Sequence, residues 1–348
     1  MCRIWKIALA ALAVVWASAA ASAPNLGEIS PLFASHEPLR LTVRAPLGRL
    51  ASDRDAAEPF DGTLTVAGSG ETLPIKLEAR GITRRSRDIC QFPPLRIEFA
   101  PKPPEGSLFR DQKRLKLVTH CRSSESFQQH VLLEYAAYRM YNLLTPLSFA
   151  VRLATIDYLE ADGEPKTSRL AFFIEDTDDA AKRNGLREAN MPDLIPSSTL
   201  SPADAGRYAM FQYMIGNLDW AIVAGPPGAG CCHNSKLVGP AGATAALVPI
   251  PYDFDFSGLV DAPYATPPDS VPVGNVRVRR YRGYCKHNAQ AGAAAAAMLP
   301  RRAALLAVLD ELPQLTPRTR AKATDYLDGF FAQIDTPTDV PKVLRTCL

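Results

Sequence analysis

The chain has 348 residues, of which 22% are charged, and its formal net charge is +3. With 39 basic and 36 acidic residues, it lacks the large basic surplus typical of proteins that bind nucleic acid, so no nucleic-acid partner is expected. A chain of this length suits one large domain or two lobes.

The first 23 residues have the pattern of a secretory signal peptide. Arg3 and Lys6 precede the apolar run IALAALAVVWA, and ASA at 21–23 offers a small-residue cleavage site. An uncleaved N-terminal anchor is the alternative. No other apolar run approaches the length of a membrane span. We therefore expect an exported protein, periplasmic or extracellular, with no membrane span after cleavage.

Cysteine usage supports this expectation. Seven cysteines become six once Cys2 leaves with the signal peptide, and an even number in an exported chain predicts disulfides. All six are expected to be bridged. We expect Cys90 to pair with Cys121, because each lies at the edge of the predicted strands of the first half.

The other four cysteines include an adjacent pair. Cys231 and Cys232 are hard to join to each other, so we expect them to pair with distant partners. Those partners are Cys285 and Cys347, in an order that the sequence leaves open. A zinc site built from the motifs CCH and CKH is the alternative, but their spacing matches no familiar zinc pattern.

Strand signals dominate the first half of the chain. Segments that alternate or run apolar between turn residues predict strands, and they are LRLTVRA (39–45), GTLTVA (62–67), LPIKLEARG (73–81), PLRIEFA (94–100) and RLKLVTH (114–120). A capped amphipathic helix is predicted over 123–144, beginning at Ser124. Two more strands, FAVRLATIDYLE and TSRLAFFIED, follow around the turn ADGEPK.

After Glu175 the pattern changes to helices and loops. PADAGRYAMFQYMIGNLDWAI (202–222) is predicted as a central helix, and 289–312 and 317–334 supply further helices. We therefore predict an α+β protein with a strand-rich N-lobe over 24–175 and a helix-rich C-lobe over 176–348. The lobe boundary is expected near 176–179, with a nucleotide-sized cleft behind it.

Three polar residues of the second half follow one another in a suggestive order. Asp219 is predicted at the end of a helix, Asn234 just before a short strand, and Asp253 at the end of the next strand. Phosphoryl transfer from ATP requires such groups. One carboxylate accepts a hydroxyl proton, and an asparagine and an aspartate hold magnesium against the phosphates.

The segment PYDFDFSGLV places Asp253 and Asp255 among aromatic and apolar residues. Unpaired carboxylates are costly in such surroundings, so they need a partner. We expect a divalent metal ion there, and a salt bridge to arginine is the alternative.

The order of these segments, with IED, GNLDW, HNSKL and PYDFDFSG, resembles the CotH family of secreted, atypical protein kinases. The family's RG motif followed by a basic stretch corresponds to EARGITRRSRDICQFPPLRIEF. Its WDxD metal motif appears as YDFD, with Tyr252 in place of tryptophan. The resemblance spans roughly residues 73–260, and each motif alone is short. It implies a two-lobed protein-kinase-like fold that uses ATP with Mg²⁺ or Mn²⁺.

Carried over to this sequence, the resemblance assigns a metal site and a base. Asp253 corresponds to the metal-binding aspartate and Asn234 to its companion, and Asp255 is expected to support the metal shell. Asp219 is the candidate catalytic base. A structural cap beside Trp220 is the alternative for Asp219.

The resemblance also assigns cofactor-binding residues. Lys116 is the candidate phosphate-binding lysine, Glu134 is expected to pair with it, and Arg80 belongs to the RG motif. Lysines often found near that motif in the family are arginines here, a change that is not neutral for phosphate binding (Arg84, Arg85 and Arg87).

The leading functional hypothesis is an exported kinase-like enzyme that transfers phosphate from ATP to a hydroxyl of a protein or small molecule. A degenerate kinase-fold scaffold or binding protein of the cell envelope is the alternative, and AMP transfer is a third possibility. The hypotheses differ in whether Lys116, Glu134, Asn234 and Asp253 converge on one cleft.

Overall fold

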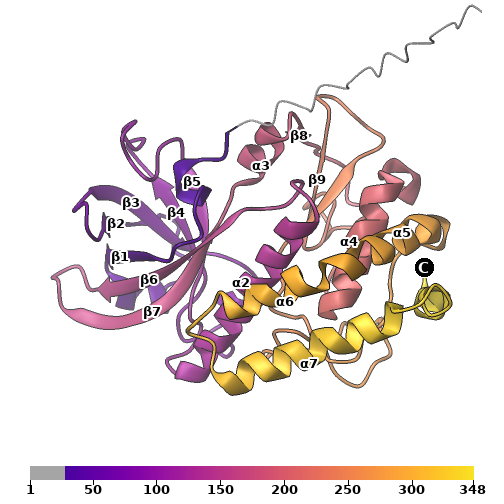
Figure 1. The fold of residues 1–348 in the computed structure, drawn as a ribbon. Helices are drawn as coiled ribbons and strands as arrows, with labels where there is room; N and C mark the ends of the chain where they lie inside the picture. Colours follow the sequence, from indigo (N-terminus) through magenta and orange to yellow (C-terminus); the bar gives the residue numbers. More distant parts are fainter. Residues whose placement is uncertain (1–27) are drawn as a thin grey trace, which may run out of the picture.

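The computed structural model describes residues 28–348, and the predicted signal peptide lies outside the described residues. Seven strands of the first half close into a barrel (Figure 1). They are β1 (Leu39–Arg44), β2 (Phe60–Val66), β3 (Thr72–Ala79), β4 (Leu95–Phe99), β5 (Arg114–Val118), β6 (Val151–Leu159) and β7 (Pro165–Ile174). Around the barrel the order is β1-β2-β3-β4-β5-β7-β6.

Closure of the barrel depends on one parallel pairing. β1 runs parallel to β6, with Leu39 opposite Ala154 and Arg44 opposite Leu159, whereas the other neighbouring strands are antiparallel. Alternate side chains point inward, as the period of two of a strand requires. They form a continuous apolar core that includes Leu41, Val43, Leu64, Ile75, Leu77, Leu95, Ile97, Leu115, Leu117 and Phe173.

The helix between β5 and β6 joins the barrel to the rest of the protein. α2 (Glu125–Leu144) begins at Ser124, whose side chain accepts the backbone N–H of Ser126 and caps the helix. It packs against β6 and β7 on one side and against α6 on the other (Figure 1). Its long buried face, from Phe127 to Tyr141, accounts for this position between two layers.

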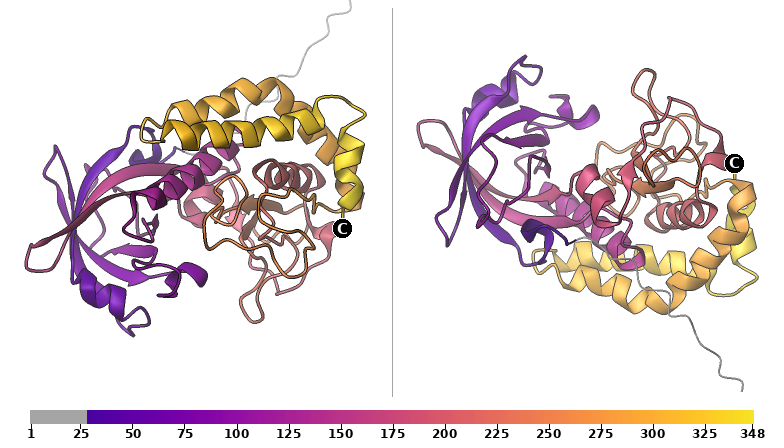
Figure 2. Two further views of the ribbon diagram at one scale, coloured as in Figure 1. Left: turned by 90° about the horizontal axis from the view of Figure 1, so that it is seen from below. Right: turned by 90° about the horizontal axis from the view of Figure 1, so that it is seen from above.

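The second half combines helices with a second, smaller sheet. The helices are α3 (Thr177–Arg183), α4 (Pro202–Ile215), α5 (Asn288–Met298), α6 (Arg302–Asp310), α7 (Pro317–Ile334) and α8 (Val340–Val343). The sheet has the order β10-β9-β8, from β8 (Arg187–Glu188), β9 (Ser235–Gly239) and β10 (Val248–Pro251). Figure 2 shows the barrel, which also carries the short helix α1 (Leu47–Ser52), at one end of the molecule and α4, α5 and α8 at the other, with α6 and α7 running between them along one side.

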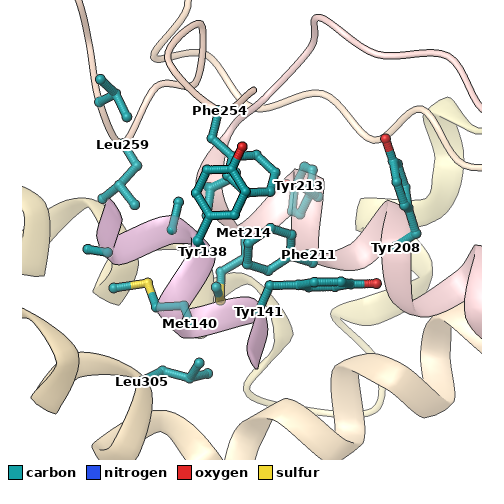
Figure 3. Packing of buried hydrophobic residues seen from close by; sticks show 14 of the residues in the cluster. Tyr138, Met140, Tyr141, Tyr208, Phe211, Tyr213, Met214, Phe254, Leu259 and Leu305 are labelled. Carbon is teal, nitrogen blue, oxygen red and sulfur yellow. The ribbon is translucent and has the colours of Figure 1, made fainter. Parts of the chain in front are cut away.

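An aromatic cluster holds α2 and α4 against the segment that follows β10 (Figure 3). The ring centroids of Tyr138 and Phe254 are 4.6 Å apart, as are those of Tyr141 and Phe211. Phe211 also meets Phe254 edge-on at 5.5 Å. Such packing fixes Phe254, and therefore the aspartates on either side of it, relative to two helices.

The prediction of a two-lobed protein-kinase-like fold with a helix-rich C-lobe is wrong. The strands of the first half form a closed mixed barrel, and the second half contains its own sheet and a long irregular stretch over 252–284. The parallel β1–β6 pairing joins segments more than a hundred residues apart, and no local pattern encodes such a contact. The boundary near 176–179 stays a prediction; the barrel ends at Ile174 and α3 begins at Thr177.

Three disulfides bridge the six cysteines expected in the exported chain. Cys90–Cys121 is confirmed. The pairing of the other four is wrong, because Cys285 is bonded to Cys347, and the adjacent cysteines are bonded to each other. Backbone hydrogen bonds explain the first of these, since the N–H of Cys285 donates to Leu348 and brings the C-terminus beside it. Three disulfides are typical of an oxidising compartment.

One helical stretch in the described part of the chain, Cys285–Asp310, is long and apolar enough to cross a membrane. This holds for its length and composition alone, and its mean hydropathy is 1.4. This stretch includes α5, which packs along α4 and buries Ala291, Ala295 and Met298. The expected absence of a membrane span after cleavage stays a prediction.

Candidate functional site

A cavity of about 560 Å³ lies where the barrel meets the second half. Its size is within the roughly 300–1,000 Å³ common for small-molecule sites. Its wall comes from the loop after β3, the segments before β9 and after β10, and the loop at 266–269. The charged and amide side chains in that wall are Arg80, Arg84, Asp219, His233, Asn234, Lys236, Asp253, Asp255 and Asp269.

Asp219 lies on a loop and not, as predicted, at the end of a helix. α4 ends at Ile215, because Gly216 takes the left-handed conformation (φ 66°) that terminates helices. The side chain of Asn217 then accepts the backbone N–H of Asp219 at 3.0 Å. This short turn directs Asp219 into the cavity wall.

Asp219 meets the residues around Asn234 although they are far apart in sequence. The amide Nδ2 of Asn234 donates to the backbone oxygen of Asp219 at 2.8 Å and to Oδ2 at 3.0 Å. Backbone hydrogen bonds in both directions between Ala221 and His233 bring the two segments together. Asp219 and Asn234 therefore lie side by side in the cavity wall, joined by hydrogen bonds.

His233 is a member of the site that sequence reasoning did not assign. Its Nε2 lies 2.8 Å from Oδ1 of Asp219. This hydrogen bond to a carboxylate raises the pKa of His233 above its ordinary value. Both carboxylate oxygens of Asp219 thus face a nitrogen, which fixes the orientation of the group. Its position next to Asn234 in CCHN is the sequence signal that could have identified it.

Asn234 and Asp253 share an uncommon backbone conformation. Their φ angles are 50° and 64°, in the left-handed region that residues other than glycine seldom occupy. The backbone N–H of Asp253 donates to the hydroxyl of Tyr138 at 2.8 Å, which helps hold this conformation. Such local backbone strain is concentrated at functional sites in proteins.

The aspartates of PYDFDFSG have an arginine as their partner. Arg84 lies 2.9 Å from Asp253 and 3.2 Å from Asp255, and a third contact at 2.9 Å reaches Glu134 on α2. Only 7% of the Arg84 side chain is exposed. The salt bridge that was the alternative to a metal ion is therefore present.

One guanidinium does not balance three carboxylates. Burial raises the pKa of Glu134, and it raises that of Asp255 well above its ordinary value. Burial by itself lowers the pKa of Arg84, but the charges of Asp255 and then Glu134 outweigh that effect and raise it. The excess negative charge is therefore balanced either by protons or by a further cation.

Asp253 is the most exposed carboxylate of this cluster, and it lines the cavity. Its side chain is 33% exposed, compared with 2% for Glu134 and 5% for Asp255. An oxygen of each carboxylate lies within 4.8 Å of the other two. Because Nδ2 of Asn234 donates to Asp219, its amide oxygen is the atom left to bind a cation. One carboxylate and one amide oxygen suit Mg²⁺ or Mn²⁺.

Two cations lie near these oxygen atoms without a carboxylate partner among residues 28–348. Nζ of Lys116, on β5, is 5.0 Å from the ring centroid of Tyr252 and 5.7 Å from that of Phe149. Burial, with a smaller contribution from Arg80, lowers the pKa of Lys116 to about 8. The other cation is Arg80, in the cavity wall.

The expected ion pair between Lys116 and Glu134 is not found in the described part of the chain. Arg84 binds Glu134 instead. Neither Lys116 nor Glu134 lines the cavity. Lys116 lies against Tyr252, and Glu134 is bound to Arg84, and both of these partners line the wall. Asn234 and Asp253 converge on the cavity, and Lys116 and Glu134 support it from behind.

No protein-family model and no curated protein matches this chain. The arrangement of the cavity residues is therefore the basis for assigning a function.

Proposed function

We propose that the chain binds ATP together with a divalent cation in this cavity and transfers a phosphoryl group to a hydroxyl of a protein or small molecule. The observation that carries the proposal is the meeting of Asp219, Asn234 and Asp253 in one cavity wall. Phosphoryl transfer requires a proton acceptor and cation-binding oxygen atoms near the same phosphate. The resemblance to the CotH family points to the same chemistry.

Asp253 and the amide oxygen of Asn234 would hold the cation, which neutralises phosphate charge when bound. The neighbouring cations Arg80 and Lys116 are suited to the remaining phosphate charge, because neither is paired with a carboxylate in residues 28–348. Arg84 holds Asp253 in place from behind. Asp255, which Arg84 also binds, supports the cation site through that arginine.

Asp219 is the proposed base. Its carboxylate is oriented by the nitrogens of His233 and Asn234, one on each oxygen. Each carboxylate oxygen has a second lone pair, so the group remains able to accept a hydrogen bond from an incoming hydroxyl. It would take the proton of that hydroxyl as the oxygen attacks phosphorus.

The place of action is proposed to be the periplasm or the extracellular space, in keeping with the three disulfides. A binding protein of the cell envelope that uses no nucleotide is the second candidate. It is favoured by one observation, the salt bridges through which Arg84 compensates Asp253 and Asp255.

Nucleotide binding separates the two candidates. We expect Mn²⁺ and ATP together, at about 100 times the dissociation constant, to raise the melting temperature of residues 24–348 by about 5 °C. ATP alone should have a much smaller effect. Mass spectrometry of acceptor proteins then distinguishes phosphoryl from adenylyl transfer by the mass added. No response to ATP, with or without Mn²⁺, would favour the nucleotide-independent binding protein.

Replacing Lys116 by Met should separate stability from ligand binding. The pKa of about 8 means that the folded protein disfavours the charged lysine. Methionine keeps the apolar stem and removes the buried charge. The substitution should therefore raise the free energy of unfolding at pH 7 by about 1–2 kcal/mol. The advantage should shrink above pH 8, where Lys116 becomes neutral. Affinity for Mn²⁺–ATP should fall at the same time, as calorimetry can measure.

A further inference from the structure

The disulfide between Cys231 and Cys232 lies in the wall of the candidate cavity. Both residues are partly exposed, and they directly precede His233 and Asn234. In contrast, Cys90 and Cys121 are buried, and neither Cys285 nor Cys347 lines the cavity. Only one of the three disulfides in residues 28–348 therefore touches the site.

This disulfide does not have the usual stabilising role of a cross-link. A disulfide stabilises a fold mainly by closing a loop in the unfolded chain, and the effect grows with the length of that loop. Cys90–Cys121 spans 31 positions and Cys285–Cys347 spans 62. Cys231 and Cys232 are one position apart and close no loop, so their bond restricts only the local backbone.

The local backbone is what positions the site. Cys231 donates its N–H to Met191 at 3.2 Å, and His233 pairs with Ala221. The left-handed Asn234 comes two residues after Cys232. Opening the disulfide would free backbone conformations immediately before the two residues that contact Asp219, and each freed residue gains conformational entropy.

We propose that Cys231–Cys232 is a redox-active site that reacts with a dithiol reductant and controls the position of His233 and Asn234. A thiolate of the dithiol attacks one sulfur and forms a mixed disulfide, which breaks the Cys231–Cys232 bond. The second thiol of the reductant then displaces the remaining cysteine. Two electrons and two protons pass to the protein, giving two thiols and a cyclic, oxidised reductant.

Two consequences follow from this chemistry. The oxidised form is the one in which Asp219, His233 and Asn234 are held together, so reduction should loosen their contacts. For nucleotide binding the inference rests on the function proposed above, whereas its effect on His233 does not. Loss of a group that orients a metal ligand typically costs about 10–100-fold in metal affinity, so reduction should weaken Mn²⁺–ATP binding by about tenfold.

The test titrates the full oxidised protein with dithiothreitol and follows three readouts. Alkylation with peptide mapping should show Cys231 and Cys232 becoming thiols while Cys90 and Cys121 remain bonded. Proton NMR should show the nuclear Overhauser contacts between the imidazole ring of His233 and the β protons of Asp219 weakening. Calorimetry should show the tenfold loss of Mn²⁺–ATP affinity.

Two double variants provide the matched controls. Cys231→Ser with Cys232→Ser should reproduce the reduced protein under oxidising conditions, and its melting temperature should change little because no loop is lost. Cys285→Ser with Cys347→Ser should lower stability but leave the contact between His233 and Asp219 unchanged. If either variant is unfolded at the temperature of the measurement, the comparison of oxidised and reduced wild-type protein decides the outcome.

The proposal is overturned if Cys231 and Cys232 are free thiols in the oxidised protein, or if reduction leaves the contact between His233 and Asp219 unchanged. If ATP binds neither redox form, the proposed function fails. In that case, loss of the contact between His233 and Asp219 on reduction would still support the redox site.

Discussion

Asp253→Asn is expected to abolish the metal-dependent binding of ATP while leaving the protein folded. Asparagine preserves the shape of the side chain but removes the charge of the most exposed carboxylate of the cluster. Losing that charge should weaken Mn²⁺–ATP binding by about 100-fold or more, equivalent to about 2.7 kcal/mol. Glu134 and Asp255 continue to neutralise Arg84, so the melting temperature without ligand should change little. Thermal-shift titration with ATP, with and without Mn²⁺, measures both effects.

The matched control is Asp269→Asn, which removes another carboxylate from the same cavity wall. It should retain most of the response to Mn²⁺–ATP, because Asp269 does not belong to the carboxylate cluster that Arg84 binds. An equal response from Asp253→Asn and wild type would show that Asp253 has a structural partner only. The arginine salt bridge would then be its whole role.

Arg84→Met should be the most destabilising single substitution at the site. It leaves Glu134, Asp253 and Asp255 without their shared partner, and two of these three carboxylates are almost fully buried. Breaking a buried ion pair from one side typically costs about 3–5 kcal/mol. For a protein of this size, that corresponds to a fall in melting temperature of about 10 °C.

The loss should depend on pH in a defined direction. The pKa values of Glu134 and Asp255 are already raised by burial, and removing Arg84 raises them further. A carboxyl group with a higher pKa in the folded than in the unfolded protein favours folding as it takes up its proton. The difference in melting temperature between wild type and Arg84→Met should therefore shrink from pH 8 to pH 5.

Arg85→Met is the control for this substitution, because it changes the neighbouring arginine. Arg85 pairs with Asp55 at the surface, where the side chains are 43% and 80% exposed, so its loss should cost less than about 1 kcal/mol. Arg84→Lys should restore only part of the stability, since an ammonium lacks the planar fork that reaches three carboxylates. Equal melting temperatures for Arg84→Met and Arg85→Met would contradict the assigned role.

The secondary structure was largely readable from the sequence. The alternation in LRLTVR predicted β1, and its Leu41 and Val43 are buried inside the barrel. Ser124 predicted the start of α2 and does cap it. The end of the central helix was misplaced, because Gly216 stops α4 several residues before Asp219. Strand period and helix caps act between near neighbours, so a linear pattern records them.

Part of the candidate site was also readable, because carboxylates beside buried strands need partners wherever they occur. The cost of burying such groups pointed to Asp253 and Asp255, and the order of the motifs pointed to Asp219 and Asn234. The partner of the carboxylates could not be identified in this way. Arg84 is one of several arginines in one short stretch, and nothing in the spacing of TRRSR distinguishes it from Arg85.

Tertiary structure alone decided the remaining features. The parallel contact between β1 and β6 closes the barrel, and the hydrogen bonds of the C-terminus bring Cys347 to Cys285. Arg84 became the buried partner because its loop folds over α2 and the segment after β10. Each of these contacts joins residues far apart along the chain. These contacts form where the packing of separate elements brings the residues together. No periodicity or spacing in the sequence specifies which distant residues will meet.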